Sequence, residues 1–117
     1  MKVIIFEEMV QALAKSGEQI AAEMTGHDAH LLHMVVGISG EAGELLDAVK
    51  KSVIYRKPLD MENVIEELGD LEFYLQDLRR ALNITREQTL QANIEKLGKR
   101  YAAGYSDAAA QNRADKA

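Results

Sequence analysis

Apolar residues recur at steps of three and four positions along most of this 117-residue chain. That spacing places them on one face of a helix, whereas a strand would require strict alternation. The two clearest series are Leu31, Met34, Val35, Ile38, Leu45, Val49 and Val53, and then Val64, Leu68, Leu71, Leu75, Leu78 and Leu82. Because the chain has a single proline and 47% apolar residues, we expect an all-α domain with a modest core.

Turn and capping residues divide the chain into four expected helices. The first spans about residues 3–24, with Gly17 as a candidate break. Asp28 is the expected N-cap of the second, which ends before Pro58 because the residue before a proline avoids helical geometry. Asp60 is placed to cap the third helix, and Thr85 to cap the fourth.

The expected architecture is a four-helix bundle formed by residues 1–104. Thr85 and Gln88 make a capping-box signature at the start of its last helix. Residues 105–117 lack a core pattern, so we expect them to form a flexible C-terminal tail or arm.

Composition narrows the possible functions. The net charge of −5 argues against general binding of nucleic-acid backbones, which calls for basic patches. The absence of cysteine excludes disulfides, zinc–thiolate sites and thiol nucleophiles. No apolar run approaches the roughly 20 residues of a membrane span, and the N-terminal one is too short for a signal peptide. A cytoplasmic protein that binds neither nucleic acid nor membrane is expected.

Two acidic pairs border the apolar stripes of successive helices. Glu41 and Glu44 share one helix face, as do Glu67 and Asp70. The stretch between them allows a turn and an antiparallel return, so both pairs should face one another. Four such carboxylates would repel strongly, and a divalent cation that prefers oxygen ligands, Mg²⁺ or Mn²⁺, would relieve this. One acidic pair alone is more often a solvated face, but two pairs, each beside a glycine, favour a metal site.

Three segments in order give the chain a family resemblance. They are GISGEAGELLD at 37–47, EELGD at 66–70 and NIEKLGKRY at 93–101. Together they resemble the MazG-like all-α nucleoside triphosphate pyrophosphohydrolase family over about residues 31–101. One departure is Ser39-Gly40 before Glu41, where many relatives have a threonine.

The resemblance implies an enzyme. Its expected reaction is Mg²⁺-dependent hydrolysis of (deoxy)nucleoside triphosphates between the α and β phosphates, giving the monophosphate and pyrophosphate, with Mn²⁺ as a possible substitute. Glu41, Glu44, Glu67 and Asp70 would be the catalytic metal ligands. Glu41 or Glu44 would instead orient or deprotonate the attacking water, and the sequence does not decide between them.

The third segment contributes candidate substrate ligands. Asn93, Lys96 and Arg100 fall on one helix face, and the resemblance implies that they, with Tyr101, contact phosphate or sugar. Lys51 is a further candidate, although a lysine there also complements the helix dipole. Solvated surface charge is the competing interpretation of Lys96 and Arg100.

Surplus apolar residues indicate a homo-oligomer, either a dimer or a tetramer. Val3, Ile4, Ile5 and Phe6 are consecutive, so a single helix face cannot bury them all. Phe73 points away from the apolar stripe of its own helix. Apolar surface of this kind commonly marks an interface, and the resemblance implies a nucleotide pocket built from more than one chain.

Two other functions compete with the hydrolase. A carboxylate-bridged di-iron bundle requires E-x-x-H motifs in two helices, and neither acidic pair has a histidine at that offset. A non-enzymatic helical interaction module would suit the amphipathic first helix but leaves the inward carboxylates unexplained.

Overall fold

The computed structural model describes residues 3–116, which form six α-helices, one 3-10 helix and no strand. The all-α class is therefore confirmed. None of the helices within this range is long and apolar enough to cross a membrane. Their bounds are α1 Phe6–Leu13, α2 Gly17–Glu23, α3 Gly26–Tyr55, α4 Met61–Ala81, α5 Arg86–Arg100, α6 Asp107–Asn112 and η1 Ala114–Lys116.

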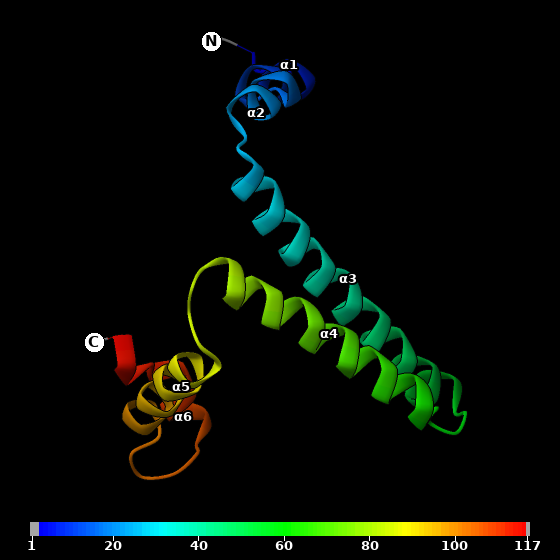
Figure 1. Cartoon of the computed structure of the whole chain (residues 1–117), viewed down its shortest axis with the longest axis vertical. Helices are drawn as coiled ribbons and strands as arrows, with labels where there is room; N and C mark the ends of the chain where they lie inside the picture. Colours follow the sequence, from blue (N-terminus) through cyan, green and yellow to red (C-terminus); the bar gives the residue numbers. More distant parts are fainter. Residues whose placement is uncertain (1–2, 117) are drawn as a thin grey trace.

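The centre of the molecule is an antiparallel hairpin of the two longest helices, α3 and α4 (Figure 1). Within residues 3–116, the only buried apolar residues are Met34 and Ala48, both on α3. The turn between the helices begins at Arg56, whose φ of 57° ends α3 in the left-handed region, and Pro58 follows it. The hairpin thus brings the middle of α3 opposite the first half of α4.

Capping explains where three helices begin. Asp60 caps α4 by accepting a hydrogen bond from the Asn63 amide at 3.1 Å, as predicted. The predicted capping box of α5 is present. The second expected helix, α3, begins three residues earlier than predicted, because its N-cap is Thr25 and not Asp28. Asp28 completes a capping box there: its carboxylate accepts from the Thr25 amide and its own amide donates to Thr25 Oγ1, both at 3.0 Å.

The N-terminal region consists of two short helices rather than one long one. α1 ends at Leu13 and α2 starts at Gly17, with Ser16 capping α2 through the Gln19 amide. The break between the two helices therefore lies just before Gly17, the residue at which a break was expected. Figure 1 shows both helices projecting from the start of α3, at the end of the hairpin furthest from its turn.

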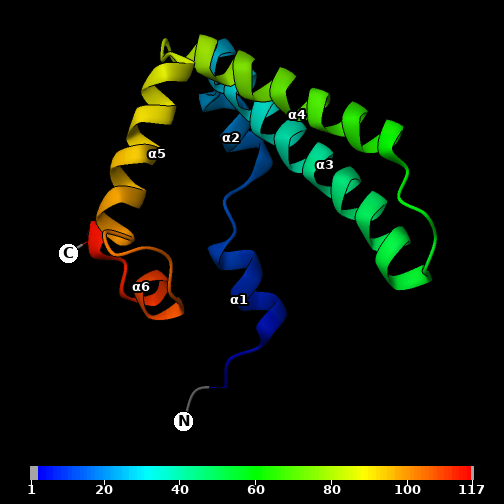
Figure 2. The ribbon, with the colours of Figure 1, turned by 90° about the horizontal axis from the view of Figure 1, so that it is seen from below.

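The C-terminal region turns away from the hairpin after α4. Figure 2 shows α5 descending from the end of α4, with α6 beside its far end. Helix α5 packs against α6 and η1, and not along α3 or α4. The segment expected as a flexible tail therefore contains a short helix and a 3-10 turn, and its flexibility and the boundary at residue 104 stay predictions.

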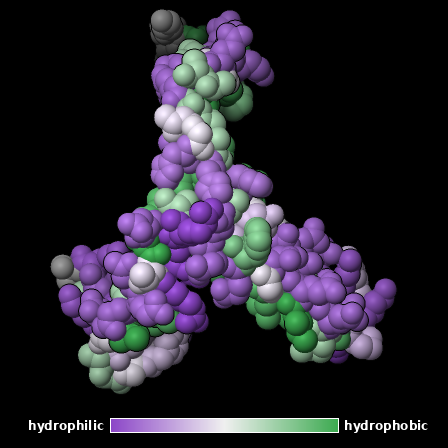
Figure 3. All heavy atoms as spheres, in the orientation of Figure 1, coloured by the Kyte–Doolittle hydropathy of each residue, from purple (hydrophilic) through white to green (hydrophobic). Residues whose placement is uncertain are grey.

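The single chain is extended, and many of its apolar side chains face solvent. Its radius of gyration is 20.4 Å, against about 13 Å for a compact domain of similar length. Phe73 on α4 is 66% exposed and Ile94 on α5 is 63% exposed. Figure 3 shows apolar surface at the turn end of the hairpin and on the N-terminal region that contains α1 and α2. Within residues 3–116, α3 and α4 are the only pair of long helices that pack along one another.

Candidate metal centre

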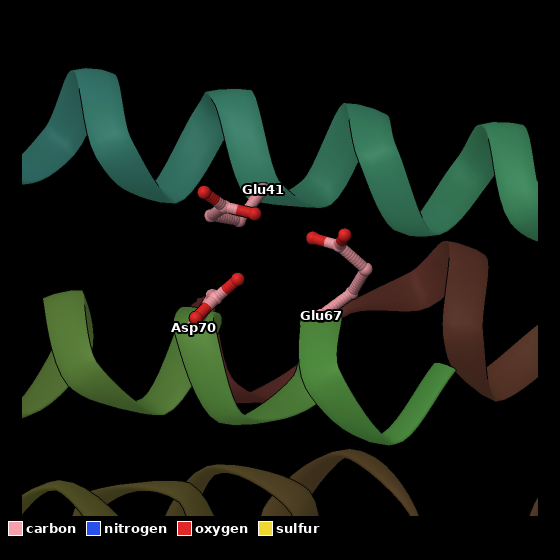
Figure 4. A group of neighbouring side chains, drawn as sticks. All are labelled: Glu41, Glu67 and Asp70. Atoms are coloured by element: carbon pink, nitrogen blue, oxygen red, sulfur yellow. The ribbon is translucent and has the colours of Figure 1, made fainter. Parts of the chain in front are cut away.

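Three of the four predicted carboxylates converge between α3 and α4. Glu41 extends from α3, and Glu67 and Asp70 extend from successive turns of α4 (Figure 4). One oxygen from each lies within 4.8 Å of the other two. The antiparallel hairpin and the three-residue spacing of Glu67 and Asp70 produce this meeting, because each side chain points across the same helix–helix seam.

The cluster holds more negative charge than its surroundings balance. Within residues 3–116, the ion pairs that the structure forms involve none of these three carboxylates. Glu67 Oε2 is buried and has no hydrogen-bond partner. The pKa of Glu67 is raised to about 7, first by the hydrogen bond that its protonated carboxyl makes to Glu41, then by desolvation and by the nearby negative charges. When Glu67 is ionised, this buried oxygen is left unsatisfied.

This arrangement fits a divalent cation. Three carboxylate oxygens from two helices approach one another, and one of these carboxylates, Glu67, has a buried oxygen without a partner. Hard cations such as Mg²⁺ and Mn²⁺ take carboxylate ligands of this kind. Exposed acidic pairs on a single helix face lack both the convergence and the buried oxygen.

The fourth predicted ligand, Glu44, lies at the edge of this group. Its side chain is exposed, and it is not among the three carboxylates that converge. Its negative charge nevertheless contributes to the raised pKa of Glu67, and also to the raised pKa of Lys51. The role of Glu44 as a metal ligand stays a prediction.

A glycine and a tyrosine that the sequence analysis did not assign to the site form a close contact beside it. A Cβ atom built on Gly37 would lie 2.6 Å from Tyr74 Cζ and closer still to two other ring carbons. The Tyr74 ring also meets the rings of Phe73 and His33 edge-on, with centroids 5.3 Å and 6.2 Å away. The sequence shows a glycine one turn before Glu41 and a tyrosine one turn after Asp70, but their contact depends on how α3 and α4 are aligned.

The predicted substrate ligands on α5 are separate from the carboxylates in this chain. Asn93, Lys96 and Arg100 belong to a helix that does not pack along the hairpin. The Arg100 guanidinium donates to both carboxylate oxygens of Asp115, at 2.9 Å and 3.4 Å. Both side chains are largely buried, with Arg100 16% and Asp115 4% exposed. This pair lowers the pKa of Asp115 and fastens η1 to the end of α5.

The last two candidates also have intramolecular partners. The Tyr101 ring lies 5.3 Å from the ring of Tyr105, centroid to centroid. Lys51 Nζ is 2.8 Å from Asp47 Oδ2, one turn earlier on α3, and both side chains are substantially exposed. The substrate contacts of all these residues therefore stay predictions.

Comparison with known proteins assigns a family to the part of the chain that holds the cluster. Residues 30–104 match the model of the MazG nucleotide pyrophosphohydrolase domain. This match includes all three converging carboxylates and leaves α1 and α2 outside it. The chain is also 32% identical over 89 residues to the Gene 37 protein of Mycobacterium phage L5, covering 71% of this chain and 76% of that protein. No solved structure matches. The chain belongs to the MazG nucleotide pyrophosphohydrolase domain family.

Proposed function

We propose that this protein hydrolyses nucleoside triphosphates, ribo or deoxy, between the α and β phosphates, giving the monophosphate and pyrophosphate, with Mg²⁺ as its cofactor and Mn²⁺ as a substitute. The observation that supports this proposal best is the convergence of Glu41, Glu67 and Asp70 inside the family-matching region. Family membership gives the general activity, and the carboxylate cluster gives it a candidate location.

The three converging carboxylates would hold the cation. When bound, it would neutralise phosphate charge and lower the pKa of a coordinated water. Glu67 would lose its proton on binding, because a carboxylate must be ionised to act as a ligand. Glu44 is one turn from Glu41 and exposed, so its carboxylate is free to serve as a fourth ligand or to accept a proton from the attacking water. Glu41 is the other candidate for orienting that water.

The phosphate and sugar contacts would come from the basic face of α5. We propose that Asn93, Lys96 and Arg100, with Tyr101, contact a nucleotide bound at the carboxylate cluster of a second chain in a homodimer or tetramer. The extended shape of one chain supports this, because α5 does not pack along its own hairpin. Arg100 would have to exchange Asp115 for a phosphate. Lys51, on the cluster's own helix, would contribute to guiding the anion inward.

Product analysis tests the proposal directly. The full chain would be incubated with a panel of ribo- and deoxynucleoside triphosphates and Mg²⁺, and the products separated by anion-exchange chromatography. We expect equal amounts of monophosphate and pyrophosphate, and none when EDTA is present. Diphosphate and inorganic phosphate would place the cleavage at another bond. No turnover with any triphosphate would favour the non-enzymatic interaction module.

A further inference from the structure

Gly37 is the one glycine at which another residue occupies the space that a side chain would need. Of the eight glycines, all within residues 3–116, the other seven have no heavy atom within 4 Å of a Cβ built on them. At Gly37 that atom would meet three ring carbons of Tyr74 at 2.6 Å or less. The contact runs along one whole edge of the ring, so a rotation at its tip would not relieve it.

Two aromatic rings border Tyr74. Phe73 precedes it with its ring nearly perpendicular at 89°, and His33 meets it from α3 at 65°. A side chain at position 37 would therefore displace either the Tyr74 ring, against these neighbours, or α4 itself. Helix separation depends on the size of the side chains at the contact, and here one partner contributes no side chain.

This contact lies one helical turn from the carboxylates, on the same seam. Gly37 is four residues before Glu41, and Tyr74 is four residues after Asp70, which corresponds to about 6 Å along each helix. On the other side of Glu41, the seam contains the buried Ala48. Small residues on α3 thus flank the cluster on both sides and keep the two helices close together at that level.

The distance between the helices bears on which cation the cluster accepts. Two oxygens that bind one ion can be separated by at most twice the metal–oxygen distance, which is about 4.2 Å for Mg²⁺ and about 5 Å for Ca²⁺. The three oxygens lie within 4.8 Å of one another, an upper value that falls between the limits for Mg²⁺ and Ca²⁺. A change of helix separation by a fraction of an ångström would therefore favour one ion over the other.

We propose that the Gly37–Tyr74 contact is a spacer that sets the separation of α3 and α4 and thereby the relative affinity of the carboxylate cluster for Mg²⁺ and Ca²⁺, with a wider separation favouring Ca²⁺. Gly37 and Tyr74 act through Glu41, Glu67 and Asp70 and are positioning residues. The inference rests on the metal site of the proposed function. It adds a structural cause for ion-size selectivity that the carboxylates alone do not supply.

Isothermal titration calorimetry of the full chain, without nucleotide, tests this inference. Mg²⁺ and Ca²⁺ would be titrated separately into the wild-type chain, Gly37→Ala and the control Gly98→Ala, which adds the same methyl group to α5 where nothing lies within 4 Å. We expect Gly37→Ala to weaken Mg²⁺ binding about tenfold and Ca²⁺ binding much less. We expect Gly98→Ala to keep the wild-type ratio of the two dissociation constants.

A second substitution tests whether the tyrosine ring causes the change. Leucine at position 74 lacks the outer ring atoms, so adding Tyr74→Leu to Gly37→Ala should bring the ratio of the two dissociation constants back toward the wild-type value. If Gly37→Ala fails to fold by circular dichroism, Tyr74→Leu alone remains informative. It lets the helices approach and should raise the preference for Mg²⁺ over Ca²⁺.

The possible results separate the inference from the proposed function. An unchanged ratio of dissociation constants in Gly37→Ala, or an equal loss for both ions, would overturn the spacer inference and leave the metal site intact. The same applies to Tyr74→Leu if its ratio matches the wild type. A wild-type chain that binds neither ion overturns both. A chain that binds Mg²⁺ with the expected selectivity but hydrolyses no triphosphate refutes only the activity.

Discussion

Binding of a divalent cation to this site should become weaker as the pH falls below neutrality. The pKa of Glu67 is about 7 in the folded protein without metal, against an ordinary value of 4.5. A ligand carboxylate must be ionised, so the proton on Glu67 competes with the metal. With this pKa, roughly nine tenths of the chains carry the proton at pH 6 and roughly one tenth at pH 8. The apparent affinity should therefore be about tenfold lower at pH 6 than at pH 8.

Calorimetric titration with Mg²⁺ at pH 6, 7 and 8, in two buffers that differ in ionisation enthalpy, measures both the affinity and the protons released. About half a proton should be released per ion at pH 7. Glu67→Gln should bind Mg²⁺ more weakly, and the release attributable to this residue should disappear. An affinity that stays constant between pH 6 and 8 in the wild-type chain would refute the reasoning from the carboxylate cluster.

The same pKa shift predicts how the stability of the metal-free protein changes with pH. Between pH 4.5 and 7 the folded state retains a proton on Glu67 that the unfolded chain has lost. Its contribution to stability is thus complete below pH 4.5 and disappears as the pH rises through 7. The melting temperature of the wild-type chain in EDTA should fall over this window relative to that of Glu67→Gln. Parallel curves for the two proteins would contradict this.

Three further predictions concern the ligands, the substrate contacts and the assembly. Glu44→Gln and Asp70→Asn should each abolish hydrolysis, a larger loss than the roughly 10–100-fold that follows when a residue only supports a metal ligand. Their melting temperatures without metal should equal that of the wild-type chain or exceed it. Full activity in either variant would count against that residue's role as a ligand. Lys96→Ala should weaken the binding or turnover of every triphosphate alike, and an effect on one base alone would show a base contact instead. Light scattering at micromolar concentration should give at least twice 13.0 kDa, and a fully active monomer would contradict the shared site.

The helices and most of their ends could be predicted from local sequence. Asp60 and Thr85 cap the helices that they were expected to cap, because a cap depends on three or four consecutive residues. The start of α3 was missed for a related reason. Thr25 and Asp28 are both good capping residues, and only the backbone shows that Asp28 occupies the third helical position of a capping box.

Helix periodicity was sufficient to predict which carboxylates of the candidate site face one another. Spacing placed Glu41, Glu67 and Asp70 on facing edges of two helices, and the structure brings them together. The contact between Gly37 and Tyr74 was not predicted, because it depends on the register between α3 and α4. Periodicity within one helix carries no information about that register.

The sequence pattern could not predict where α5 lies relative to the other helices. An apolar stripe shows that a helix needs a partner, but not which helix or which chain supplies it. In this chain the last helix lies apart from the hairpin, and Arg100 is paired with a carboxylate 15 residues later. Long-range ion pairs of this kind follow from tertiary folding and leave no periodic trace.

The scarcity of buried apolar residues in one chain has a consequence for how the protein would respond to its own abundance. Only Met34 and Ala48 are buried within residues 3–116, and an isolated helical hairpin with so small a core is marginally stable at best. If association supplies the missing burial, folding and assembly become one step, and the unfolding midpoint rises with protein concentration. Dilution would then expose the chain to unfolding and proteolysis. Activity would increase more steeply than in proportion to the amount of protein made.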